Sequence, residues 1–64
     1  MTSIYDYYLK GYDNGIIFSY IPEFKSERQK LAFNMGYKDA KANLPQKEID
    51  SFKKEFSLYV SGKE

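Results

Sequence analysis

The chain has 64 residues, with ten Lys and Arg against nine Asp and Glu, and it contains no Cys, His or Trp. Residues 1–64 are therefore expected to form one small domain, without a disulfide framework, a thiolate metal site or histidine-based acid–base chemistry. The formal net charge of +1 argues against a protein that binds nucleic acid mainly by bulk electrostatics.

The first predicted helix covers residues 3–15. Ser3 is a suitable N-cap, and Asp6 in the first turn complements the helix dipole. Apolar and aromatic residues follow at helical spacing. Gly11 and Gly15 each cost such a helix about 1 kcal/mol relative to Ala, and we interpret Gly15 as the C-terminal cap.

Residues 16–25 lose the helical period. Their apolar run favours extended structure, but no second strand-like run exists with which it could pair. Pro22 also prevents a continuous helix through this segment. We therefore predict an apolar connector that lies over the core.

The second predicted helix covers residues 26–42. Ser26 and Gln29 have the spacing of a capping box. Asn43 tolerates the left-handed conformation that often ends a helix, and Pro45 prevents its continuation.

The third predicted helix covers residues 45–60, because Pro45 suits a first helical turn and apolar residues then recur at helical spacing: Ile49, Phe52, Phe56, Tyr59 and Val60. The predicted fold class is all-α. We expect a small three-helix domain in which the first two helices form a close-packed hairpin with an apolar connector, and the third helix covers the aromatic core.

Small residues recur on the first two helices and are followed by Tyr at two positions, Gly11-Tyr12 and Gly36-Tyr37. Such a stripe of small side chains lets two backbones approach closely. This explains why a Gly that lowers helix stability stands inside a helix. We predict that the helices cross there; the alternative is a groove that accepts the backbone of a partner. The predicted crossing residues are Gly11, Gly15, Ala32, Gly36 and Ala40.

No motif with catalytic spacing is present in the sequence. It contains no phosphate-binding Gly-rich loop and no nucleophile elbow. We interpret its carboxylates as solvated helix faces, because seven Tyr without a partner base indicate a core or an interface. We therefore expect no enzymatic activity, no cofactor and no metal.

The two parts of the chain differ in charge and in aromatic content. Residues 1–24 hold one Lys against three acidic residues, a net charge of −2, whereas residues 25–64 hold nine basic against six acidic residues, a net charge of +3. The Tyr residues near the N-terminus are too many for one helix face, so we expect some of them, Tyr7 above all, to be exposed as a contact surface. The predicted partner-binding residues are Tyr5, Tyr7, Tyr8, Tyr12, Asp6 and Asp13.

The basic residues of the second helix form an alternative site. Arg28, Lys38 and Lys41 could contact phosphate groups of RNA. An ordinary solvated helix face explains the same residues.

Three short stretches also resemble ribosome modulation factor and its small phage and plasmid relatives. They are Gly11-Tyr12 with Gly15, Tyr20-Ile21-Pro22, and Gly36-Tyr37 with Ala40, and the resemblance spans about residues 8–42. It implies a pair of close helices joined by a Pro-containing connector, and association with the ribosome. In this chain Tyr37 stands where that family usually has Trp.

Taken together, these features predict a small cytoplasmic binding protein, of the kind encoded by phages and mobile elements. It would inhibit or modulate a larger host protein or complex by steric occupation. The alternatives are a ribosome- or RNA-associated modulator and a structural homo-oligomer such as a homodimer. No membrane association is expected, because the longest apolar stretch, residues 16–21, is far shorter than the ~20 residues that span a bilayer.

Overall fold

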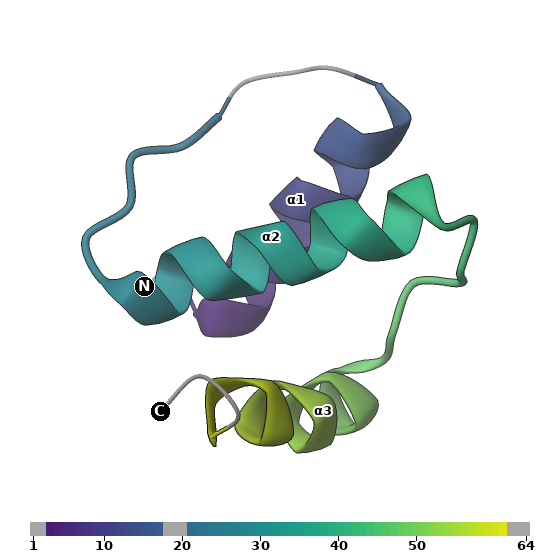
Figure 1. The fold of residues 1–64 in the computed structure, drawn as a ribbon. Coiled ribbons are helices and arrows are strands. Elements are labelled where there is room, and N and C mark those ends of the chain that lie inside the picture. Colours follow the sequence, from purple (N-terminus) through teal and green to yellow (C-terminus); the bar gives the residue numbers. More distant parts are fainter. Residues whose placement is uncertain (1–2, 18–20, 62–64) are drawn as a thin grey trace.

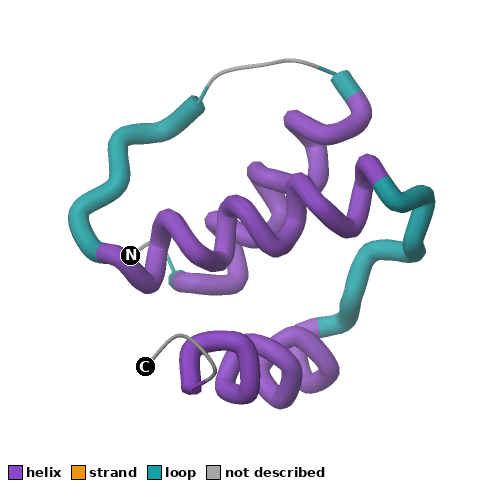
Figure 2. Tube along the Cα trace, in the orientation of Figure 1, coloured by secondary structure: helices purple, strands orange, loops and turns teal. Residues whose placement is uncertain are grey.

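A computed structural model describes residues 3–17 and 21–61 of the chain, and this part contains three helices (Figure 1). They are α1 (Ile4–Ile16), α2 (Glu27–Lys41) and α3 (Ile49–Ser61). The described residues contain no strand, so the predicted all-α class is confirmed (Figure 2). The middle of the predicted apolar run, residues 18–20, lies outside the described residues.

Helices α1 and α2 begin where their capping residues predict. Ser3 and Asp6 form a reciprocal capping box at α1: the Ser3 hydroxyl accepts from the Asp6 N–H and the Asp6 carboxylate accepts from the Ser3 N–H. At α2 the Ser26 hydroxyl accepts from the Gln29 N–H. The Gln29 side chain accepts from the N–H of Lys25 rather than from that of Ser26, so the predicted box is shifted by one residue.

The predicted cap at Gly15 is wrong. Helix α1 continues to Ile16, and the N–H of the next residue, Ile17, donates to the Asp13 carbonyl. None of the described glycines has a positive φ. Gly15 instead lies against Ala40 and Tyr37 of α2, so its lack of a side chain serves the contact between the two helices.

The predicted start of the third helix at Pro45 is also wrong, because α3 begins at Ile49. Asn43 ends α2 with a φ of 61°, as expected, and the Leu44 N–H then donates to the Asp39 carbonyl. The backbone of Lys47 forms hydrogen bonds with the hydroxyls of Tyr5 and Tyr8 in α1. These tertiary hydrogen bonds hold residues 44–48 outside the helix that Pro45 alone would permit.

Helices α1 and α2 cross with their backbones in direct contact, as the small residues predicted. A Cβ on Gly11 would overlap the Phe33 carbonyl group, and a Cβ on Gly36 would overlap the Tyr8 carbonyl oxygen and lie 2.7 Å from the Tyr12 nitrogen. Neither site can hold a side chain without separation of the helices. This close packing is the reason for a glycine inside each helix.

The crossing helices run in the same overall direction. Gly11 of α1 faces Phe33 of α2, and four residues further along, Gly15 faces Ala40. The chain must therefore return from the end of α1 to the start of α2, and residues 21–26 of this connection pass outside the helix pair (Figure 1).

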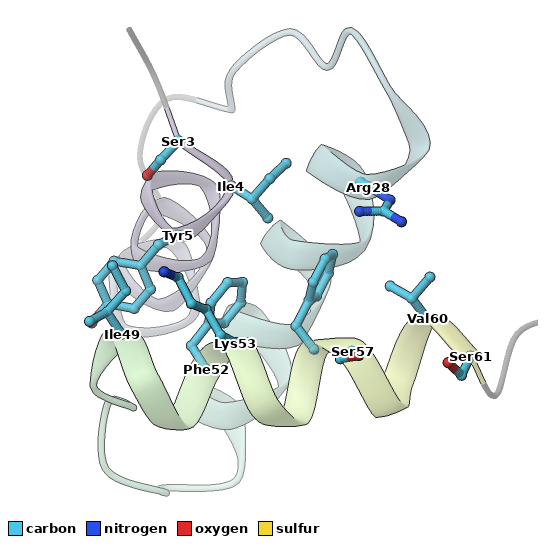
Figure 3. A pocket seen from close by; sticks show the side chains of 11 residues that line it. Ser3, Ile4, Tyr5, Arg28, Ile49, Phe52, Lys53, Ser57, Val60 and Ser61 are labelled. Carbon is cyan, nitrogen blue, oxygen red and sulfur yellow. The ribbon is translucent and has the colours of Figure 1, made fainter.

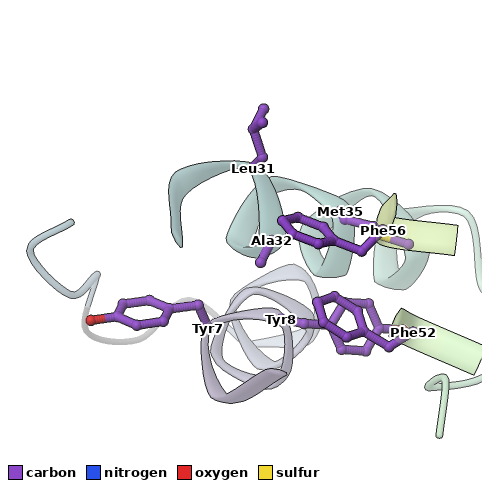
Figure 4. Packing of buried hydrophobic residues seen from close by; sticks show 7 residues of the cluster. All are labelled: Tyr7, Tyr8, Leu31, Ala32, Met35, Phe52 and Phe56. Atoms are coloured by element: carbon purple, nitrogen blue, oxygen red, sulfur yellow. The ribbon is translucent and has the colours of Figure 1, made fainter. Parts of the chain in front are cut away.

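Aromatic rings form the core on both sides of this helix pair (Figure 4). Tyr8 packs on Phe52 with ring centroids 5.0 Å apart, and Phe52 stacks on Phe56 at 5.1 Å, so α3 covers one side as predicted. Tyr7 points the other way and packs against Phe24 of the connector at 6.0 Å. The buried core cluster consists of Tyr7, Tyr8, Leu31, Ala32, Met35, Phe52 and Phe56.

The described residues of the connector cover the core only in part. Phe24 contacts Phe33 of α2, with ring centroids 5.2 Å apart, as well as Tyr7 of α1. Ile16, Ile17 and Ile21, however, remain 50–72% exposed. Among the described residues, the predicted cover over the core is therefore supplied mainly by the Phe24 ring.

We predict that Gly36→Ala lowers the free energy of unfolding by about 1–3 kcal/mol or more, because the new methyl group must push the helices apart. The effect is opposite in sign to the helix propensity of Ala, which alone would stabilise the helix. Urea unfolding followed by circular dichroism measures the change. Gly11→Ala should behave in the same way.

Lys10→Ala is the control, since it leaves an alanine side chain on the exposed face of α1, where no helix contact is affected. Its stability should stay within about 0.5 kcal/mol of the parent. A Gly36→Ala variant as stable as this control would contradict the described crossing.

Candidate functional site

The predicted tyrosine contact surface is not exposed in the way the sequence suggested. Tyr7 is 8% exposed and Tyr8 is fully buried, so the expectation of exposed rings is wrong for both. Tyr7 was expected to be exposed because it lies off the main apolar stripe of α1. The connector returns over that side and covers it with Phe24.

The hydroxyl groups of three α1 tyrosines hold the segment between α2 and α3. Tyr5 donates to the Lys47 carbonyl at 2.7 Å, and Tyr12 donates to the Leu44 carbonyl at 2.5 Å. The Tyr8 hydroxyl accepts from the Lys47 N–H at 2.9 Å and donates to the Asp39 carboxylate at 2.8 Å. These hydroxyls therefore hold the segment that leads into α3.

The two predicted acidic contact residues have different environments. Asp6 is part of the α1 capping box, which accounts for its carboxylate locally. Asp13 is exposed on the same helix. Neither carboxylate joins a cluster, because the described residues contain no group of three acidic side chains that could hold a metal ion.

Asp39 and Lys47 form an ion pair next to the Tyr8 hydroxyl, and the sequence did not predict this pair. Lys47 contacts the Asp39 carboxylate at 2.5 Å, with side chains 14% and 11% exposed, and lies 3.6 Å from the more exposed Glu55. Asp39 stands four residues after Met35 and seven after Ala32, both buried. That spacing is the sequence signal that would have placed Asp39 on the buried face of α2.

The charge states of this cluster follow from burial and pairing. Burial raises the pKa of Tyr8 far above its usual value; the Lys47 N–H opposes this rise, while the Asp39 carboxylate adds to it. For Lys47, burial alone would lower the pKa, but the Asp39 and Glu55 carboxylates more than offset it, so the pKa is raised. At neutral pH the cluster contains a neutral phenol, a carboxylate and an ammonium group that satisfy one another.

The three basic residues predicted for RNA contact are not brought together. Arg28 lies in the first turn of α2, about 15 Å along the helix axis from Lys38. Lys38 lies over the Tyr59 ring, with its nitrogen 5.9 Å from the centroid, and Lys41 lies over the Tyr37 ring at 5.4 Å. The role of these residues in RNA binding stays a prediction.

The candidate site is an apolar groove between α3 and the first turns of α1 and α2 (Figure 3). Its volume is about 550 Å³, which lies within the range of ligand-binding pockets. Of the predicted partner-binding residues, only Tyr5 lines it, and of the predicted RNA-binding residues, only Arg28 does. The lining residues are Ser3, Ile4, Tyr5, Arg28, Ile49, Phe52, Lys53, Phe56, Ser57, Val60 and Ser61.

The groove combines apolar surface with positive charge. Ile4, Phe52, Phe56 and Val60 supply apolar side chains, and Ile49 at one end is 45% exposed. The two charged lining residues are both cations, one from α2 and one from α3, and the lining contains no carboxylate. No local pattern in the sequence predicts this groove, because its residues come from three separate helices.

Comparison of the chain with protein-family models, curated proteins and solved structures finds no match. The resemblance to ribosome modulation factor therefore stays a prediction. Among the described helices, none has both the length and the apolar character needed to cross a bilayer.

We predict that the protein loses stability as the pH rises above about 10. Tyr8 and Lys47 both have raised pKa values in the folded chain, so each binds its proton more tightly there than in the unfolded chain. Their contribution is complete at lower pH and decreases once the unfolded chain begins to lose these protons. Urea unfolding at about pH 7, 9 and 11 measures this dependence.

Tyr8→Phe tests the tyrosine part of this effect. It should cost about 1–3 kcal/mol at neutral pH, because the Asp39 carboxylate and the Lys47 N–H each lose a partner. The decrease between about pH 9 and pH 11 should then become shallower than in the parent. Tyr37→Phe, on an exposed ring, should keep the parent's decrease; equal slopes for all three proteins would contradict the role of Tyr8.

Proposed function

We propose that this protein acts by binding a larger protein through the apolar groove, and that it inhibits or modulates that partner by occupying its surface. The observation that carries this proposal is the groove itself: apolar side chains of α1 and α3, together with Arg28 of α2, surround a space of about 550 Å³ that the described residues leave open. Burial of such surface against a partner is the main source of binding free energy in protein association.

Binding, rather than catalysis, is supported by the places of the reactive side chains. Tyr8, Asp39 and Lys47 are the groups whose hydrogen bonds could resemble an acid–base site, but they bond to one another and to the segment between α2 and α3. They lie outside the lining of the groove. The groove lining offers hydroxyl groups and two cations but no carboxylate to act as a base.

A protein partner is supported by the kind of surface that lines the groove. Tyr5, Phe52 and Phe56 are aromatic, and Arg28 is a type of residue enriched at interface hot spots. Ile49 extends the apolar surface to the exposed end of the groove. Occupation of a partner's surface needs no moving part, which suits a small chain held together by direct helix contact.

Ser57→Glu tests the proposal, with Ser51→Glu as its matched control. Both serines are exposed on α3, but only Ser57 lines the groove, so the same charge is added on different faces. With the immobilised chain, we expect the parent and Ser51→Glu to capture the same protein from a lysate of the host cells. Ser57→Glu should capture it at least about ten-fold less, the loss produced by about 1.4 kcal/mol of binding free energy.

Two further results would contradict the proposal. Equal capture by both variants, with both folded by circular dichroism, would exclude the groove as the contact surface. Loss of the captured material after nuclease treatment, or when salt is raised from about 50 to 200 mM, would instead support the RNA-associated alternative.

A further inference from the structure

We propose that the occupant of the groove is an amphipathic helix of the partner, with acidic residues beside its apolar stripe. This inference rests on the proposed function and specifies the partner's chemistry. It combines three features of the groove: its length along α3, its position between helices, and its unbalanced positive charge.

The shape of the groove suits a helix. Its lining residues extend along α3 from Ile49 at the first position to Ser61 at the last. The 13 residues of α3 span about 20 Å, or between three and four helical turns. A partner helix with apolar residues at i, i+3 or i+4, and i+7 would place a continuous stripe along this length.

The bottom of the groove offers matching apolar contacts. Phe52 and Phe56 are buried. Ile4 and Val60, which also line the groove (Figure 3), are only half-buried. Additional apolar side chains laid over Ile4 and Val60 would complete their burial. A helix at this place would add a fourth member to the three-helix arrangement.

The charge of the groove selects an acidic partner. Arg28 and Lys53 line it without an acidic residue, and among the described residues neither of them makes an ion pair. Lys47, by contrast, is paired with Asp39 and Glu55. Arg28 also lies in the first turn of α2, where the helix dipole disfavours a cation and attracts an anion.

A second copy of the chain suits the groove less well. In a two-fold symmetric contact, the same patch faces itself, so Arg28 and Lys53 of one groove would approach those of the other. Like charges brought together oppose association. An acidic helix from a different protein would instead be attracted by the same two cations.

The experiment uses the full chain and three synthetic helical peptides of about fourteen residues. Each peptide carries leucines at i, i+4, i+7 and i+11, and the residues beside that stripe are Glu, Gln or Lys. Titration of isotope-labelled protein by NMR should show shifts at Ile4, Phe52 and Val60. The Glu peptide should bind most tightly and the Lys peptide most weakly, with smaller differences at high salt.

Matched variants then assign the charge preference to the two groove cations. Lys53→Gln and Arg28→Gln should each weaken binding of the Glu peptide by about two- to five-fold and leave the Gln peptide unaffected. Lys54→Gln and Lys30→Gln remove neighbouring exposed lysines outside the lining, and both should bind the Glu peptide like the parent.

Several outcomes would overturn the inference: binding that ignores peptide charge, no binding of any peptide, groove shifts caused only by self-association, or preferential binding of an RNA oligonucleotide at these residues. These outcomes are distinguishable from failure of the proposed function. If Ser57→Glu prevents partner capture while the peptides show no charge preference, groove binding stands and the acidic helix is wrong. If Ser57→Glu leaves capture unchanged, the proposed function itself is wrong.

Discussion

The direct contact between the backbones of α1 and α2 is the constraint on which the other features depend. Gly11 lies against the Phe33 carbonyl and Gly36 against that of Tyr8, so the two helices are closer than any pair of side chains would allow. The apolar area gained by such an approach offsets the helix propensity lost at each glycine. A chain of 64 residues without cysteines depends strongly on such packing for its stability.

This crossing determines where the tyrosines of α1 point. With α2 against its glycine face, α1 directs Tyr8 toward α3 and Tyr7 toward the connector. The hydroxyls of Tyr5 and Tyr8 then hold the backbone at Lys47, which sets the start of α3. The groove follows from this placement, because α3 buries its own Phe52 and Phe56 in the core but leaves Ile4 and Val60 only half-buried.

Sequence patterns predicted the helix ends that depend only on neighbouring residues. Ser3 and Ser26 marked two N-termini, and Asn43 marked an end with its positive φ, because capping and left-handed backbone involve only neighbouring residues. The start of α3 was predicted four residues too early, since Pro45 permits a helix that the distant tyrosine hydroxyls prevent. Gly15 was wrongly predicted to be a cap, because the contact that requires a glycine there is with Ala40 and Tyr37 of another helix.

The candidate site depends even more on contacts between helices than the helix ends do. The all-α class, the close crossing at Gly11 and Gly36 and the aromatic core could be predicted from the sequence, because periodicity and small-residue spacing report directly on helix faces. The burial of Tyr8 against Asp39, the pairing of Lys47 and the meeting of Arg28 and Lys53 in one groove could be seen only in the folded chain. Those facts depend on how three helices pack together, and no short-range pattern encodes the distance between residues on different helices.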